Sequence, residues 1–586
     1  MKLRTIAFLM SILMLFASLV SCDTTDIAVS SDVTSEVVET SSQPEESKPE
    51  KETSSAKTEA TSSAKAEATS SEEEKNYVFE IIYPTVTASN LKINLTTADV
   101  QRFKAKVTET KNIAKSHQGA RLDEFRNAVY ELLTLEEAFQ TECDAAYLLY
   151  CCDMNDDTWD TYMDAYNRYN DVHDSFWGFR NSLYGTSIIF VDALEQIIDE
   201  TFGKLTAVRS DAYFAEMKKL EGEYNSLKNN NASDDEMFEV YKKYLIAADN
   251  YAKSGDSTDY YDYACEVLYN RTDTAEQREV FREYVKEYLV PLGKLLGMRY
   301  RVFDSQLSAD EYDLSNSYLY DAYDTFEENY LFDYFLSLPK SASEIMVGVF
   351  DEDRIIIGDK DTSLNSAMVY TVGSTPICYF HKGKMAIDTM AHELGHYYAD
   401  TVSNTKDFSF SLKETHSTAN TLLCYSYLSE KIDNIAFHST ETYMTFDWMY
   451  QIVASVIKDE FDEIIATSDL STLTLQELQN IMNDLINEYD VRDFSTNMVT
   501  NLMNYWRKHA IGYFGENYCY AEGFLASCQI YIKSKTDYDA AIKIYKKLVE
   551  EPKNGGEYIA TIKHAGLTTP YDEQTFIEIE KLFEIQ

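Results

Sequence analysis

The sequence predicts a mostly α-helical protein, with a large two-lobed body of many helices and one small β-sheet. Residues 120–150 and 276–298 repeat apolar side chains at spacings of three and four, which is the period of an amphipathic helix. Only 8 of the 586 residues are proline, so long helices can run uninterrupted. Short β-rich runs with Gly- and Asp-containing turns, at residues 343–361 and 368–380, predict the sheet.

The N-terminus has the features of an export signal. Lys2 and Arg4 precede an apolar run at residues 6–20, which is short for a membrane-spanning helix and has the length of a signal-peptide core. The run ends in Leu-Val-Ser-Cys, which resembles the bacterial lipobox. That resemblance implies that residues 1–22 are a lipoprotein signal peptide, cut before Cys22, and that a lipid on Cys22 anchors an extracytoplasmic protein to the bacterial cell membrane. A plain secretory signal with a chance cysteine is the alternative.

Residues 23–76 predict a disordered tether. Ser, Thr, Glu, Ala and Lys dominate this segment, and an eight-residue unit, TSSAKTEA, recurs in it with small changes. Such a composition cannot bury enough apolar area to offset the entropy lost on ordering. We expect an N-terminal helical lobe at residues 77–345 and a second region, with the motifs described below, at residues 346–586.

The charge balance excludes one class of partner. The chain has 52 basic and 99 acidic residues, a formal net charge of −47, which repels the phosphate backbone of nucleic acids. Eight cysteines remain after Cys22, without a metal-type C-x-x-C spacing. These cysteines can either form disulfides or remain as buried free thiols.

The stretch His-Glu-Leu-Gly-His at residues 392–396 predicts a metal site. Positions four apart on a helix project from one face, so His392 and His396 can bind one zinc ion through neutral imidazoles. Glu393 lies beside this pair, where it can act as the general base that takes a proton from metal-bound water. Gly395 leaves room beside the metal. Two core histidines on an amphipathic helix are the alternative.

A catalytic zinc site needs a third protein ligand and an open position for water. The metzincin pattern requires a histidine at the sixth position after His396, where this chain has Val402. Asp400 lies too far along the same helix to close around one ion.

Glu414 is the favoured third ligand. It lies 18 residues after His396, at the start of a second predicted helix that can fold back on the first. A capping box with Ser411 is the competing role for Glu414. His416 is the less favoured ligand, because two residues further along a helix it points to another side.

These residues carry a family resemblance. "AIDTMAHELGH" (residues 386–396) followed by "KETHSTANTLL" (residues 413–423) resembles the oligoendopeptidase F and thimet oligopeptidase family of zinc peptidases. The resemblance implies that the Glu-x-x-Ser segment from Glu414 to Ser417 supplies the third ligand, so that each chain holds one zinc ion. Its specific motifs cover roughly residues 345–586. The region from residue 77 onward resembles the family only in being helical.

The C-terminal region extends the resemblance. Residues 509–534 resemble the family's histidine- and tyrosine-rich loop, and residues 554–576 resemble its closing Gly-Gly and Lys-x-Ala-Gly helices. This implies that His509, Tyr518 and Tyr520 contact the substrate and the developing oxyanion, with Tyr513 less well matched. Packing of these rings between helices is the alternative.

Two departures from the family pattern bear on activity. The spacing from His396 to Glu414 is several residues shorter than is usual, and Thr421 stands where the family tends to have a glutamate. An acid near a ligand histidine helps to hold it, and Asp388, one turn before His392, can substitute.

The sequence therefore predicts a membrane-anchored, extracytoplasmic zinc metalloendopeptidase that hydrolyses short peptides. We expect the strand at residues 374–380 to bind the substrate backbone as an extra strand. A peptide-binding lipoprotein with weakened catalysis and an exopeptidase on the same scaffold are the alternatives. The sequence does not determine the oligomeric state.

Overall fold

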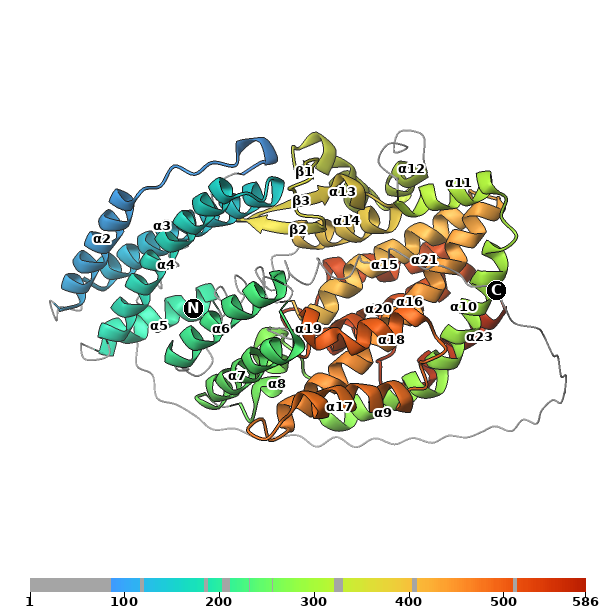
Figure 1. The fold of residues 1–586 in the computed structure, drawn as a ribbon. Coiled ribbons are helices and arrows are strands. Elements are labelled where there is room, and N and C mark those ends of the chain that lie inside the picture. Colours follow the sequence, from blue (N-terminus) through green and yellow to red (C-terminus); the bar gives the residue numbers. More distant parts are fainter. Residues whose placement is uncertain are drawn as a thin grey trace, which may run out of the picture. The chain divides into compact units, whose positions relative to one another are not determined.

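Helices make up most of the structure, and one small sheet interrupts them, as the sequence predicts (Figure 1). The computed structural model describes residues 86–115, 121–183, 188–202, 211–230, 232–255, 257–320, 330–402, 408–509 and 514–585, which all belong to one compact unit. The predicted signal peptide, Cys22 and the predicted tether lie outside these residues. No helix in the described ranges is long and apolar enough to span a bilayer.

All the described secondary structure before the sheet is helical. The first group contains η1 (Ala88–Asn90), α2 (Thr97–Lys115), α3 (Leu122–Cys152), α4 (Asp156–Leu183) and α5 (Ile188–Phe202). The second group contains α6 (Asp211–Asn229), α7 (Asp234–Lys253), α8 (Tyr260–Tyr263), the π-helical turn η3 (Ala264–Leu268), α9 (Ala275–Tyr284), the π-helical turn η4 (Val285–Leu289), α10 (Val290–Asp304), α11 (Ala309–Tyr320), α12 (Tyr330–Ser337) and α13 (Lys340–Asp351).

The sheet has three strands, and further helices follow it. The strands are β1 (Ile355–Gly358), β2 (Ala367–Val372) and β3 (Thr375–His381), followed by the short η5 (Lys382–Lys384). The last group contains α14 (Ile387–Val402), α15 (Phe410–Ser429), α16 (Ile435–Thr467), α17 (Leu475–Glu488), α18 (Thr496–Met503), α19 (Tyr505–His509), α20 (Glu516–Thr536), α21 (Tyr538–Glu550), α22 (Tyr558–Ala565) and α23 (Glu573–Ile585).

The predicted strand content of residues 343–361 is confirmed only after residue 354. Residues up to Asp351 belong to α13, and β1 covers Ile355–Gly358. The buried residues of α13 are Ala342, Met346 and Val349, whose spacings of four and three place them on one helical face. The β-branched residues near Val349 concealed this helical period.

The strand order is β1–β3–β2, with β1 parallel and β2 antiparallel to β3. β3 therefore lies in the centre, and both of its edges are paired. The prediction that residues 374–380 bind a substrate as an extra strand is wrong, because a central strand has no free main-chain groups to offer. The two edges of the sheet belong to β1 and β2.

The sheet separates two hydrophobic cores. Side chains alternate between the faces of a strand, and in β3 Cys378 and Phe380 belong to one core while Ile377 and Tyr379 belong to the other. One core contains α2–α5 with one face of the sheet, and the other contains α6–α23 with the opposite face. Figure 1 shows α3 and α4 on one side of the strands and α13 and α14 on the other.

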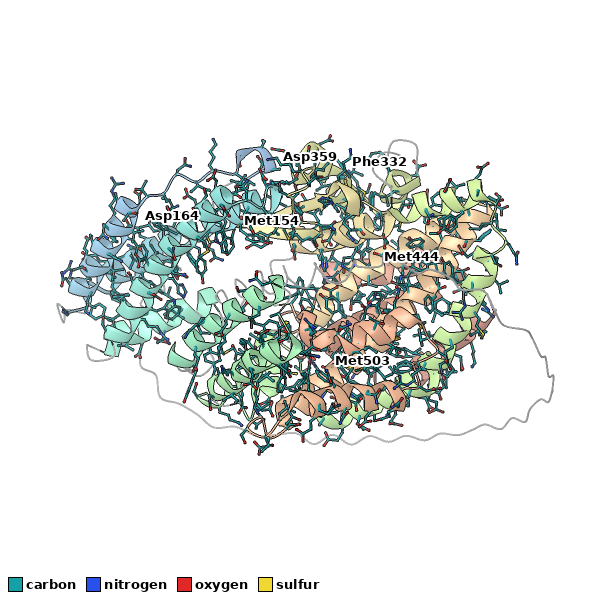
Figure 2. The ribbon with its side chains drawn as sticks, viewed as in Figure 1. Met154, Asp164, Phe332, Asp359, Met444 and Met503 are labelled. Atoms are coloured by element: carbon teal, nitrogen blue, oxygen red, sulfur yellow. The ribbon has the colours of Figure 1, made fainter. Side chains whose placement is uncertain are left out.

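This packing divides the chain differently from the expected lobes. Residue 345, the expected boundary, lies inside α13. The hydrophobic packing changes instead between α5 and α6, because α6–α13 share a core with the later helices. Met444 of α16, labelled in Figure 2, is one of the buried residues of that shared core.

All eight described cysteines are unpaired thiols, and seven of them are buried. The choice that the sequence left open is therefore resolved in favour of free thiols. Desolvation raises the pKa of these buried thiols, for example that of Cys528 to about 12, so they act as small apolar core residues.

Candidate metal centre

Helices α14 and α15 bring three side chains together at one point. The Nε2 atom of His392 lies 3.7 Å from Oε2 of Glu414, and Nε2 of His396 lies 3.8 Å from Oε1 of Glu414. One ligand atom from each of the three lies within 4.8 Å of the other two. It is the one such group of three found among the described residues. The predicted ligand set is thus assembled, although the spacing from His396 to Glu414 is short for the family that the motifs resemble.

The chemistry of these groups fits a divalent cation such as zinc. Ligands of a tetrahedral zinc ion lie about 3.4 Å apart when each bond is about 2.0 to 2.1 Å long, close to the two distances given above. Oε2 of Glu414 is buried and has no hydrogen-bond partner in the described part of the chain, which is costly for a carboxylate oxygen unless a ligand binds it. Burial lowers the pKa of His392 to about 4, so its imidazole is neutral at pH 7, as a metal ligand must be.

Glu393 lies next to His392 on the same helix, α14. Its side chain is 8% exposed, and burial raises the pKa of its carboxyl to about 8, while a backbone hydrogen bond with Val369 of β2 acts in the opposite direction. Burial and the nearby Glu393 also raise the pKa of Glu414 to about 8. A bound divalent cation would favour the charged form of both carboxyl groups and so lower both pKa values.

Two glycines allow the backbone of α15 to approach its neighbours closely. A Cβ at Gly395 of α14 would lie 2.7 Å from Cα of Ser417, and a Cβ at Gly523 of α20 would lie 2.9 Å from Cβ of Glu414. Real Cβ atoms do not come this close to other atoms. Gly395 therefore permits helix packing beside α15, whereas the sequence suggested that it leaves room for the metal.

Side chains of α15 also bond to α14 directly. Nδ2 of Asn420 donates to the carbonyl of Ala391 at 2.6 Å, immediately before the first ligand histidine. The hydroxyl of Thr421 donates to Ser417 O at 3.1 Å and lies 3.5 Å from Asp388 O. Thr421, which replaces an acid of the family pattern, thus contacts the main chain of α14.

Asp388, which can substitute for the missing acid, lies in the first turn of α14. Its carboxylate accepts a hydrogen bond from the main-chain N–H of Thr389 at 2.7 Å. The charge of Asp388 raises the pKa of Tyr425 and of Asp447, whereas burial alone accounts for the lowered pKa of His392.

The start of α15 leaves Glu414 available as a ligand. Ser409 caps this helix by accepting from the main-chain N–H of Leu412. Ser411, the alternative partner of Glu414 in a capping box, donates instead to Oε2 of Glu522 at 2.7 Å. The competing structural role of Glu414 is therefore absent.

His416 is not part of the metal group. Its ring is fully buried and packs edge-on against Phe408, with 5.2 Å between the ring centroids. Burial lowers the pKa of His416 to about 3. This ring is a neutral core side chain, as the sequence analysis favoured.

Of the loop residues predicted to act on the substrate, the structure brings Tyr520 toward the site. On α20, Glu516, Tyr520 and Gly523 share a face, because their spacings are four and three. Gly523 contacts Glu414. The ring of Tyr520 lies 5.4 Å from that of Phe410, the first residue of α15, and the charge of Glu414 raises the pKa of Glu516.

Tyr518 lies on another face of α20. It is fully buried, and its ring centroid lies 4.1 Å from the guanidinium carbon of Arg271 and 5.2 Å from the ring centroid of Phe281. The structure thus packs Tyr518 in the core and does not bring it to the metal group. His509 ends α19, but its side chain lies outside the described residues, as does all of Tyr513.

A buried charge network fixes the start of α20. Arg271 donates to the carbonyl oxygen of Gly515 at 2.7 Å and to Asp459 at 3.1 Å, and it pairs with Asp273 through two bonds of 2.8 Å. Gly515 has φ of +80°, a conformation that favours glycine. The sequence analysis missed Arg271, which stands in a polar segment without a motif. It also missed Gly523, whose signal was an isolated glycine inside a helical pattern.

Comparisons with solved structures identify the fold. A structure of PZ peptidase A with an inhibitor shares 15% identity, with a TM-score of 0.64, and covers 85% of this chain and 99% of that chain. A structure named as an oligoendopeptidase F of Bacillus anthracis strain Ames shares 13% identity, with a TM-score of 0.60, and covers 86% and 98%. A further oligoendopeptidase F structure shares 15% identity, with a TM-score of 0.62 and the same coverage.

This protein therefore has the fold of oligoendopeptidase F and PZ peptidase. The resemblance that the motifs indicated is confirmed for the fold, and it extends beyond residues 345–586, because those residues alone cannot make up 85% of the chain. No model of a known protein family matches the sequence, and no curated protein matches it either.

We predict that removing the third ligand abolishes tight metal binding. Glu414→Gln should lower the affinity for zinc by about 100-fold or more, since a neutral amide replaces the one anionic ligand. Titration of the metal-free protein with zinc, in competition with a chelating dye, measures this. The matched control is His416→Gln, which should bind zinc like the wild type. Loss of zinc in the His416 variant together with retention in the Glu414 variant would contradict the ligand assignment.

Proposed function

We propose that the protein is a zinc metallopeptidase that hydrolyses short peptides as an endopeptidase. The observation that carries this proposal is the convergence of His392, His396 and Glu414 with Glu393 beside them. The fold shared with PZ peptidase A and oligoendopeptidase F supports it. Since fold alone does not define an activity, the proposal depends on the site.

The residues of the chain have distinct roles in this reaction. His392, His396 and Glu414 would hold the zinc ion, which when bound polarises the scissile carbonyl and makes a water molecule more acidic. Glu393 takes a proton from the attacking water while the water oxygen bonds to the carbonyl carbon. It then gives that proton to the amide nitrogen, so that the C–N bond breaks and the amine leaves.

The free edge of β2 is suited to hold the substrate backbone. The N–H of Cys378 bonds to Arg354 on the β1 side, so its partner Val369 directs its main-chain groups away from β3. Ala367 and Thr371 do the same, because alternate residues share an edge. A main-chain group of Val369 bonds to Glu393, which places this edge next to the general base and leaves Ala367 and Thr371 to pair with a peptide. A peptide added along β2 would bring its carbonyl groups near Glu393.

Tyr520 is the favoured donor to the developing oxyanion. When water attacks a peptide carbonyl, the oxygen gains negative charge, and a positioned phenol stabilises it more in the transition state than in the ground state. Tyr520 shares its face of α20 with Gly523, which contacts the ligand Glu414.

The membrane anchor stays a prediction. We propose that a lipid on Cys22 holds the protein outside the cytoplasmic membrane. In cell fractionation, the wild-type protein should sediment with membranes, and Cys22→Ser should either appear in the soluble fraction or keep its uncut signal. Membrane sedimentation of a Cys22→Ser protein with a cleaved signal would refute the anchor.

We predict that Glu393→Gln retains zinc but loses peptide hydrolysis. The ligands are untouched, whereas the general base is gone, so turnover should fall by about 10² or more. Mass spectrometry of a mixed peptide library, incubated with and without a chelator, measures this for the full chain. Internal cuts indicate an endopeptidase, terminal cuts an exopeptidase, and no cuts a peptide-binding protein. The matched control is Glu430→Gln, an exposed change at the end of α15, which should cut like the wild type.

We predict that the two tyrosines of α20 respond differently to loss of the hydroxyl. Tyr520→Phe should lower kcat about 10- to 10³-fold, because it removes the oxyanion donor. Tyr518→Phe should leave kcat within about 3-fold of the wild type, because that ring packs on Arg271. Steady-state kinetics on one library peptide measures both. An equal loss in the two variants, or a loss confined to Tyr518→Phe, would refute the assignment.

A further inference from the structure

A buried carboxyl group that the proposed reaction does not use joins α20 to the helix of the third metal ligand. Glu522 of α20 is only 3% exposed, and both of its oxygens accept hydrogen bonds. Ser411 of α15 donates to Oε2 at 2.7 Å, and Tyr571, which lies between α22 and α23, donates to Oε1 at 2.9 Å. A buried carboxyl group is costly unless such bonds replace its contacts with water, whereas an apolar side chain could fill the same space without partners.

These bonds lie one helical turn from the ligand Glu414. Ser411 precedes Glu414 by three residues, and residues three apart are neighbours on a helical surface. On α20, Gly523 follows Glu522 directly and approaches Glu414, since a Cβ at Gly523 would lie 2.9 Å from Cβ of Glu414. The ligand helix and α20 are therefore joined at two adjacent points beside the metal group.

The two points constrain α15 in different ways. The contact at Gly523 sets how closely the helices approach, but a glycine has no side chain that could stop α15 from sliding along its own axis. The hydrogen bond from Ser411 to Glu522 is directional and resists this sliding. Near the ligand, the other hydrogen bond between the two helices, from Ser527 to the carbonyl of Thr415, is longer, at 3.3 Å. The bond to Glu522 is thus the shorter restraint of the two.

A metal ligand tolerates little sliding of its helix. Metal–ligand distances are fixed to within about 0.2 Å, whereas neighbouring residues of a helix differ in height by about 1.5 Å. A shift of α15 by even a fraction of this rise would move the Glu414 carboxylate away from the position where it can share one ion with the histidines of α14. The restraint at Ser411 therefore acts on the coordinate to which the site is sensitive.

We propose that Glu522 is a positioning residue of the metal site, which acts on Glu414 through Ser411. Its bond to Ser411 holds α15 along its axis, so that the Glu414 carboxylate stays at the distance from the two ligand histidines that one zinc ion requires. The proposal rests on the zinc site of the function proposed above, and it does not depend on which peptide bond the enzyme cuts.

Two serines of α15 form a matched pair for the test. Ser426, like Ser411, is buried and has a hydroxyl bonded to α20, where it accepts from Ser534 at 2.7 Å. It follows Glu414 by 12 residues, which is about 18 Å along the helix. Ser411→Ala and Ser426→Ala each remove one buried hydrogen bond between the same two helices. Both should therefore lower the melting temperature of the metal-free protein by similar amounts.

Metal binding should separate the two variants. The full-length metal-free protein is titrated with zinc in competition with a chelating dye. Ser411→Ala should bind zinc about 10-fold more weakly than the wild type, whereas Ser426→Ala should stay within about 2-fold. The visible absorption spectrum of the cobalt-substituted protein reports the geometry of coordination, and it should change in Ser411→Ala but not in Ser426→Ala.

A second variant tests the carboxyl group itself. Glu522→Gln should also weaken zinc binding, because an amide has one acceptor oxygen for two hydroxyl donors. Combined with Ser411→Ala, it should weaken binding no further than the weaker-binding single variant, since both changes remove the same bond.

Unchanged zinc affinity in Ser411→Ala and Glu522→Gln, additive losses in the double variant, or an equal loss in Ser426→Ala would overturn the proposal. A wild-type protein that binds no zinc would overturn it together with the zinc site. A wild-type protein that binds zinc but cuts no peptide would refute the peptidase function alone.

Discussion

The close approach of α15 to two glycines is the constraint on which the site depends. Gly395 of α14 approaches α15 at Ser417, and Gly523 of α20 approaches it at Glu414. Because a main chain in contact with a main chain has little freedom to shift, the position of Glu414 relative to the histidines is set by packing.

The local part of the site followed from the sequence. His392, Glu393 and His396 share one helix, so their arrangement follows from helical periodicity alone. Glu414 was accessible as the first acid of the next helix and through the family motif. The sequence did not show which of Tyr518 and Tyr520 lies near the metal group. Two residues apart on α20, they face different neighbours, and only the contacts of Gly523 and Arg271 show which face meets the metal group.

Long-range pairing limited the prediction of the fold. The helical class and the presence of a sheet before α14 followed from hydrophobic spacing. The central place of β3 did not, because strand order depends on which segments meet in space, and a parallel partner such as β1 has no local signal. The division between the hydrophobic cores was also hidden, since α6–α13 have the same pattern of apolar residues as the helices with which they pack.

The alternation of β3 between the two cores couples the two halves of the fold. Cys378 and Phe380 pack in one core, and Ile377 and Tyr379 pack in the other. A shift of one residue would exchange these sets and place the large Tyr379 ring where Cys378 now fits. An insertion or deletion within this strand would therefore disrupt both cores. During evolution, β3 can change its side chains, while its length must remain constant for both cores at once.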